Sequence, residues 1–159
     1  MKVLVVSDSH GRDNYLEEAI RAEEPFDMFL HLGDLEGSER FIHQHVNCTI
    51  AMVRGNNDFF SQLNTDLTVQ IGSHKAFLTH GHRYHLEYGY EMLREAARRE
   101  GADMVIFGHI HVPVVDYQGG MITLNPGSIS LPRQEGHRPS YITIECEPGG
   151  EPICRVKYL

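Results

Sequence analysis

Short apolar runs alternate with amphipathic stretches through the first two thirds of the chain. Apolar runs bounded by polar residues or glycine are typical of buried strands. They predict strands over Lys2–Val6, Met28–Leu32, Thr49–Val53, Leu67–Ile71, Lys75–Thr79 and Asp103–Phe107. Apolar residues at helical spacing predict helices over Asn14–Glu24, Ser38–His45 and Tyr88–Glu100.

From Val112 onward the pattern changes to consecutive strands, with hairpin signals at Gln118-Gly119-Gly120 and Pro148-Gly149-Gly150. Strand–helix units followed by consecutive strands predict an α/β fold with two sheets packed face to face and helices outside, an α/β/β/α sandwich. A chain of 159 residues with 41% hydrophobic content suits one domain, which we expect to span residues 1–159.

Five polar signatures each directly follow an apolar run. They are Asp8-Ser9-His10, Gly33-Asp34, Gly55-Asn56-Asn57-Asp58, His80-Gly81-His82 and Gly108-His109-Ile110-His111. Because open α/β sheets place their chemistry at the carboxyl ends of the strands, we expect these signatures to share one site. Residues two apart in an extended segment point the same way, so Asp8 with His10, and His109 with His111, are expected to face one crevice.

Seven of these side chains are candidate metal ligands: Asp8, His10, Asp34, Asn56, His80, His109 and His111. Oxygen and imidazole ligands without cysteine suit Mn²⁺, Fe²⁺, Ni²⁺ or Zn²⁺ better than soft-metal clusters. Seven ligands exceed the need of one tetrahedral ion and suit two ions that share a carboxylate. The sequence therefore predicts a two-metal site.

The ordered set of signatures resembles the calcineurin-like metallophosphoesterase family, and the match runs from Asp8 to Arg133. Asn125-Pro126-Gly127-Ser128, followed by Pro132-Arg133, is similar to the small bacterial and archaeal phosphodiesterase branch of that family. The resemblance implies the same sandwich architecture and two divalent ions, Mn²⁺ foremost. It also implies a phosphoesterase that hydrolyses its substrate by attack of a metal-bridging hydroxide.

The resemblance further implies a division of the ligands between the two ions. Asp34 would bridge the ions. One ion would be held by Asp8, His10 and His111, and the other by Asn56, His80 and His109.

One position departs from the family pattern, because Asn57 stands where the widespread motif has a histidine assigned to protonating the leaving group. A carboxamide cannot act as a general acid near neutral pH. Either His82 donates the proton or the leaving group departs unaided, which would favour activated diesters. Asn57 could instead hydrogen-bond the phosphate, so Asn57 and His82 are the candidate catalytic residues.

Three further features carry open alternatives. The segment from Asn125 to Ser128 could be a simple turn, or Ser128 and Arg133 could bind the substrate phosphate. His31 lies inside an apolar run, which favours a hydrogen-bonded core histidine that orients a ligand. His85 is expected to be peripheral.

The charge balance bears on the substrate. With 22 acidic against 14 basic residues, the formal net charge of −8 disfavours capture of nucleic acid and points to a small phosphoester. A monoesterase or phosphoprotein phosphatase remains an alternative, as does a scaffold similar to the retromer subunit of this fold. Since all seven ligand positions are chemically competent, we favour an enzyme.

The surroundings of the protein are also predicted from simple features. No apolar run is long enough for a signal-peptide core or a membrane span, and three cysteines without metal-type spacing suit reduced thiols. We therefore expect a soluble cytoplasmic protein without membrane contact. A homodimer is expected from the resemblance.

Overall fold

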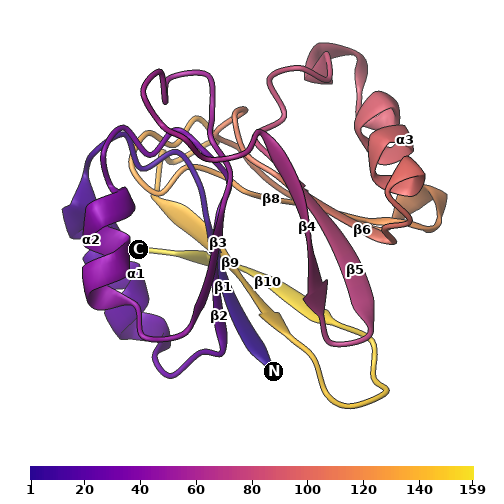
Figure 1. The fold of residues 1–159 in the computed structure, drawn as a ribbon, viewed down its shortest axis with the longest axis horizontal. Helices are drawn as coiled ribbons and strands as arrows, with labels where there is room; N and C mark the ends of the chain where they lie inside the picture. The colour runs from indigo at the N-terminus through magenta and orange to yellow at the C-terminus, as the bar shows by residue number, and fades with distance from the viewer.

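The computed structural model describes residues 1–159 and contains two five-stranded sheets (Figure 1). The first sheet has the order β10-β9-β1-β2-β3. Its strands are β1 (Lys2–Val6), β2 (Met28–His31), β3 (Thr49–Met52), β9 (Ser140–Glu145) and β10 (Ile153–Tyr158). β1, β2 and β3 run parallel, whereas β9 pairs antiparallel with both β1 and β10.

The second sheet has the order β4-β5-β6-β8-β7. Its strands are β4 (Asp66–Ile71), β5 (His74–Thr79), β6 (Met104–Phe107), β7 (Pro113–Asp116) and β8 (Ile122–Pro126). β5, β6 and β8 run parallel, and β4 and β7 close the edges as antiparallel partners. The predicted change from strand–helix units to consecutive strands is therefore confirmed.

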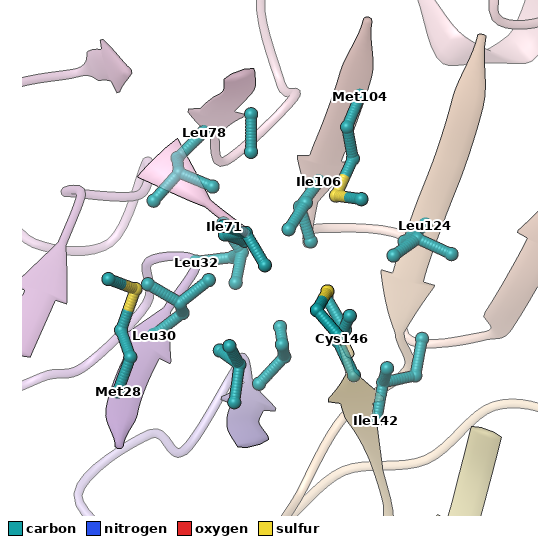
Figure 2. Close-up of a cluster of buried hydrophobic side chains, with 14 of the residues drawn as sticks. Met28, Leu30, Leu32, Ile71, Leu78, Met104, Ile106, Leu124, Ile142 and Cys146 are labelled. Atoms are coloured by element: carbon teal, nitrogen blue, oxygen red, sulfur yellow. The ribbon is translucent and has the colours of Figure 1, made fainter. Parts of the chain in front are cut away.

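The two sheets pack against each other through a cluster of 15 buried side chains, part of which Figure 2 shows. Residues along β1 alternate between two environments, because Val3 and Val5 belong to this central cluster while Leu4 and Val6 face the helices. β1 is thus apolar on both faces, as expected for a central parallel strand. This packing fixes the two sheets relative to one another.

Helices cover the outer faces of both sheets. α1 (Asp13–Glu23) and α2 (Glu39–His45) pack on the first sheet, and α3 (Glu91–Arg99) packs on the second (Figure 1). The predicted α/β/β/α sandwich is confirmed. None of the helices combines the length and apolar composition needed to cross a bilayer.

The main difference from the predicted elements lies before α3. A helix was expected from Tyr88, but a 3-10 turn occupies Leu86–Tyr88 and α3 begins at Glu91. Gly89 adopts φ 102°, a left-handed value that interrupts any helix and that glycine accepts without a steric penalty. A second 3-10 turn, Gln118–Gly120, lies in the predicted β7–β8 hairpin.

Candidate metal centre

Side chains from four strand ends meet at one edge of the sandwich, the upper edge in Figure 1. Two groups have ligand atoms within 4.8 Å of one another: Asp8 with His10 and His111, and Asp8 with Asp34 and His80. The carboxyl ends of β1, β2, β5 and β6 supply them. Five of the seven predicted ligands are thus brought together, which is a sufficient set to hold a divalent cation.

The histidines of this centre are oriented by hydrogen bonds on their outer nitrogens. Nδ1 of His80 lies 2.6 Å from the Leu32 carbonyl, and Nδ1 of His111 lies 2.7 Å from the Leu131 carbonyl. Nδ1 of His10 lies 2.5 Å from the Glu36 carboxylate. Because each of these oxygens can only accept, the Nδ1 atoms carry the proton and each Nε2 presents a lone pair, as in metal-binding histidines.

The inner nitrogens converge on one point. Nε2 of His10 and Nε2 of His111 are 3.5 Å apart, and Nε2 of His111 is 3.0 Å from Oδ1 of Asp8. Oδ1 of Asp8 is buried and accepts no hydrogen bond. Facing lone pairs and a buried, unsatisfied carboxylate oxygen are costly without a cation, so the residues present fit a divalent metal.

The two buried carboxylates, Asp8 and Asp34, favour a positive charge between them and the histidines. Burial raises the pKa of Asp8, but the close approach of His111 and His80 outweighs burial and lowers that pKa. Burial likewise raises the pKa of Asp34, and contacts with His80 and Asn57 reverse the shift. Both carboxyls therefore remain ionised near neutral pH.

The backbone at the ligands is strained rather than extended. Five ligands have positive φ: Asp8, His10, Asp34, His109 and His111, at 56°, 47°, 55°, 71° and 60°. The assumption of extended segments was therefore wrong, although Asp8 and His10 do reach the same cluster. His109 and His111 diverge, since only His111 joins it. Such left-handed residues are uncommon outside glycine and gather at functional sites.

Glycines in the signatures leave room for the ligands. A Cβ on Gly55 would lie 2.1 Å from Oδ1 of Asp34, and a Cβ on Gly108 would lie 2.1 Å from Oγ of Ser7 and 3.1 Å from Oδ2 of Asp8. Both positions require glycine because a neighbouring loop approaches this closely.

The remaining two predicted ligands lie at the rim. Oδ1 of the exposed Asn56 is 3.1 Å from Nε2 of His80. His109 is half-buried, and its ring centre is 5.2 Å from that of His80. Its backbone N–H donates to Oδ2 of Asp8 over 3.2 Å. Asn56 and His109 are adjacent to the cluster without completing it.

The two candidate catalytic residues lie beside the same cluster. Asn57 donates from its side chain to Oδ2 of Asp34 over 2.6 Å and from its backbone to Oδ1 over 2.9 Å. Its carboxamide therefore holds the Asp34 carboxylate. His82 has a buried Nδ1 without a hydrogen-bond partner and lines, with His109, a cavity of about 280 Å³.

Ser128 does not lie where a substrate could reach it. Its hydroxyl is fully buried, donates to the Asp8 carbonyl over 2.9 Å and accepts from the N–H of Leu131 over 2.8 Å. Asn125 donates to the Gly108 carbonyl over 2.7 Å. The segment thus braces the loops that carry Asp8 and His109, and the expected contact of Ser128 with substrate is not available. Arg133 is exposed, with its N–H bonded to the His111 carbonyl at 3.0 Å.

His31 has the role expected from its apolar surroundings. It is fully buried, its Nδ1 accepts from the Gly33 N–H over 3.2 Å and its Nε2 lies 3.0 Å from Oγ of Ser9. Burial lowers the pKa of His31 to about 4, so the ring is neutral. It connects the two loops that carry Asp8 and Asp34.

Two residues that hold parts of the metal centre in place were not predicted from the sequence. Glu36 holds Nδ1 of His10, and the Asp58 carboxylate accepts from the N–H groups of Gly55 and Glu36 over 2.7 and 2.8 Å. Asp58 closes its own signature, which was a usable signal. Glu36 meets His10 across 26 positions of sequence, and no spacing rule predicts that pairing.

Comparison with known proteins agrees with this geometry. Residues 1–149 match the model of the calcineurin-like phosphoesterase superfamily domain, and the chain belongs to that family. The probable metallophosphoesterase YsnB of Bacillus subtilis is 37% identical over 134 residues, covering 84% of this chain and 78% of YsnB. A phosphodiesterase of Methanocaldococcus jannaschii is 27% identical over 147 residues, covering 80% of this chain and 83% of that protein.

Solved structures share the fold. A Streptococcus pneumoniae protein described as a predicted phosphoesterase has a TM-score of 0.80 at 30% identity, covering 99% of this chain and 88% of that one. Vps29 from Entamoeba histolytica complexed with Zn²⁺ has a TM-score of 0.78 at 24% identity, covering 99% of both chains. The second likeness concerns the fold alone.

Proposed function

We propose that this chain is a divalent-metal-dependent phosphodiesterase for small or activated phosphodiesters. The observation that carries the proposal is the convergence of imidazole Nε2 atoms, each with its Nδ1 proton held outside, on two buried carboxylates. Membership of a phosphoesterase family supports hydrolysis of a phosphate ester. A relative named as a phosphodiesterase favours the diester over the monoester.

The division of the ligands into two sets follows what the family resemblance implies. Asp8, His10 and His111 would hold one ion, and Asn56, His80 and His109 a second, with Asp34 between them. When bound, two divalent ions would supply the positive charge that stabilises a phosphate ester and would acidify water near neutral pH. Mn²⁺ is our expectation for the metal, because the ligands are oxygen and imidazole.

Three side chains around the ligands orient a ligand or contact the substrate. Asn57 holds Asp34 through two hydrogen bonds, which fixes the orientation of that carboxylate. Arg133 is an exposed cation on the segment bonded to the His111 carbonyl, and we assign it to the substrate phosphate. His82 has a buried ring nitrogen without a hydrogen-bond partner beside the centre, and we assign it to the leaving group.

The net charge and the cysteines support expectations about the binding partners and location of the protein. The formal charge of −8 supports a small phosphoester rather than a stable nucleic-acid complex. All three cysteines, Cys48, Cys146 and Cys154, are free thiols, which supports action in the reducing cytoplasm. A homodimer stays a prediction.

A metal-dependent assay tests the proposed function. Purified protein is stripped with a chelator, then given Mn²⁺ and assayed with bis-p-nitrophenyl phosphate, p-nitrophenyl phosphate and cyclic nucleotides. We expect diester hydrolysis that is lost on chelation and restored by Mn²⁺. Preference for the monoester would indicate a phosphatase, and absence of any turnover would indicate a scaffold.

The identity of the proton donor is tested with two variants. If His82 protonates the leaving group, His82→Ala should reduce turnover of alkyl diesters by ~10²–10⁴-fold while p-nitrophenyl diesters lose little, because only the alkoxide needs a proton. Asn57→His should raise alkyl-diester turnover if no donor is present. A gain in Asn57→His with no loss in His82→Ala would remove His82 from this role.

A further inference from the structure

Two adjacent phenylalanines project into solvent beside the metal centre. Phe59 is 77% exposed and Phe60 is 96% exposed. Both lie in the connection between β3 and β4. Isolated exposed apolar residues are common, but two large neighbouring aromatic side chains at the rim of a functional site are typical of a ligand contact.

The two rings form one wall of a cavity of about 800 Å³. The other lining residues are polar, charged or glycine, and they include Glu36, Glu39, Arg40, His43 and Gln62. Ligand pockets in proteins usually have ~300–1,000 Å³ and combine apolar surface with a few polar groups. The cavity therefore suits a ligand that has a flat apolar part and several hydrogen-bonding groups.

Two residues that line this cavity also contact ligands of the metal centre. Asn57 lines it and donates to Oδ2 of Asp34 over 2.6 Å. Glu36 lines it and holds Nδ1 of His10 at 2.5 Å. A substrate with its phosphate at the metal centre therefore has the cavity directly beside it, one residue beyond the ligands.

The segment that presents the phenylalanines is anchored on both sides. Asp58 accepts from the N–H groups of Gly55 and Glu36, and Oγ of Ser61 donates to Glu39 over 2.7 Å. The Ser61 N–H also bonds to the Asp58 carbonyl over 3.2 Å. The backbone that carries Phe59 and Phe60 is therefore held on both sides, which lowers the entropic cost of ordering this segment when a ligand binds.

We infer that this cavity binds the nucleoside of a phosphodiester substrate, with the base stacked on Phe59 or Phe60. The inference rests on the proposed function. Every nucleobase offers a flat face that stacks on aromatic side chains, and the sugar hydroxyls match the polar lining. A simple aryl group would use the rings but leave the polar side chains of Arg40, His43 and Gln62 without partners, so we favour the nucleoside.

Paired substrates with one leaving group test the inference. In the Mn²⁺-loaded protein, kcat/KM is measured for the p-nitrophenyl esters of thymidine 5′-phosphate and of methyl phosphate. We expect wild type to prefer the thymidine ester, and the Phe59→Ala/Phe60→Ala variant to reduce that ratio by about tenfold or more. The change should lie in KM, because stacking is lost equally from ground and transition states. Phe59→Tyr/Phe60→Tyr should restore the ratio.

Tyr117→Ala is the matched control, because Tyr117 is an exposed aromatic residue in the β7–β8 connection, outside the cavity. Calorimetric titration with thymidine 5′-monophosphate gives a second readout that needs no turnover, and the double alanine variant should bind it about tenfold more weakly. An unchanged ratio and unchanged binding in that variant would overturn the inference while leaving the phosphodiesterase intact. Hydrolysis of neither ester by wild type would overturn both, and equal preference for a phenyl ester would replace the nucleoside by a simple aryl group.

Discussion

The ligand set that we propose for one ion, Asp8, His10 and His111, differs in structure from the set that we propose around His80, and each set is called a half of the centre below. In the first half, three ligands converge and both histidines have their Nδ1 atoms held. In the second half, His80 is held in the same way, but Asn56 is exposed and His109 stands outside the cluster. Asp8, Asp34 and His80 also converge, so the two sets differ in Asn56 and His109 alone. We expect these two side chains to complete a second site only when an ion binds.

Preorganisation has a thermodynamic consequence. Buried ligands lose little conformational freedom when an ion binds, whereas the more exposed side chains of Asn56 and His109 have more freedom to lose. We therefore expect two unequal metal affinities, with the tighter site at Asp8, His10 and His111.

The largest expected effect belongs to Asp34, which we propose to lie between the two ions. Asp34→Asn removes a charge between the two sets of ligands with almost no change of volume. Loss of several kcal/mol of charge stabilisation corresponds to at least ~10²–10³-fold in kcat/KM. Turnover of bis-p-nitrophenyl phosphate and far-ultraviolet circular dichroism measure activity and fold, with Asp27→Asn as a distant control. Full activity in Asp34→Asn would contradict the assignment.

A pair of alanine variants separates the two halves. His111→Ala should weaken the tighter Mn²⁺ site by more than the ~10–100-fold that is typical for loss of an outer partner. His109→Ala should spare the tighter site and weaken or abolish the second. Calorimetric Mn²⁺ titration of both variants and wild type measures this. Equal losses in both variants would show that the halves are not distinct.

Changing a residue that holds a ligand from outside should weaken Mn²⁺ binding less than removing the ligand itself. Glu36→Gln leaves His10 in place but replaces the carboxylate that holds its Nδ1 proton. We expect ~10–100-fold weaker binding at the tighter Mn²⁺ site and little change at the other. Glu151→Gln is the matched control, because Glu151 is exposed in the β9–β10 connection, at the edge opposite the carboxyl ends of β1 and β2. The idea fails if the two glutamine variants bind Mn²⁺ alike.

The smallest effect concerns stability without metal. His111 is buried and bonded to the Leu131 carbonyl, so His111→Ala should lower the free energy of unfolding by ~1–3 kcal/mol. His109 is half-exposed and has no side-chain hydrogen bond to the protein, so His109→Ala should change it by no more than ~0.5 kcal/mol. Urea unfolding in the presence of a chelator provides the comparison. The reverse order would mean that the His109 half is the rigid one.

Much of the fold was predictable because its signals are local. The apolar runs at β1, β2 and β6 and the turns at Gln118 and Pro148 predicted strands and hairpins close to their observed places. The start of α3 was not predictable from periodicity alone, since Gly89 interrupts an otherwise helical pattern.

The site was predictable in composition but not in detail. Strand ends marked Asp8, Asp34 and His80, because chemistry gathers there in parallel sheets. Left-handed backbone at the ligands gave no sequence signal outside glycine. The pairing of Glu36 with His10 and the burial of Ser128 depend on loops that meet only in the folded chain.

The most direct test of the account is an anomalous-scattering map of crystals soaked in Mn²⁺. We predict two peaks, one contacted by Asp8, His10 and His111 and one contacted by Asn56, His80 and His109, with Asp34 coordinating both. At limiting Mn²⁺ the first peak should be the stronger. A single peak, or an Asp34 carboxylate beyond coordination distance of either peak, would contradict the two-metal centre.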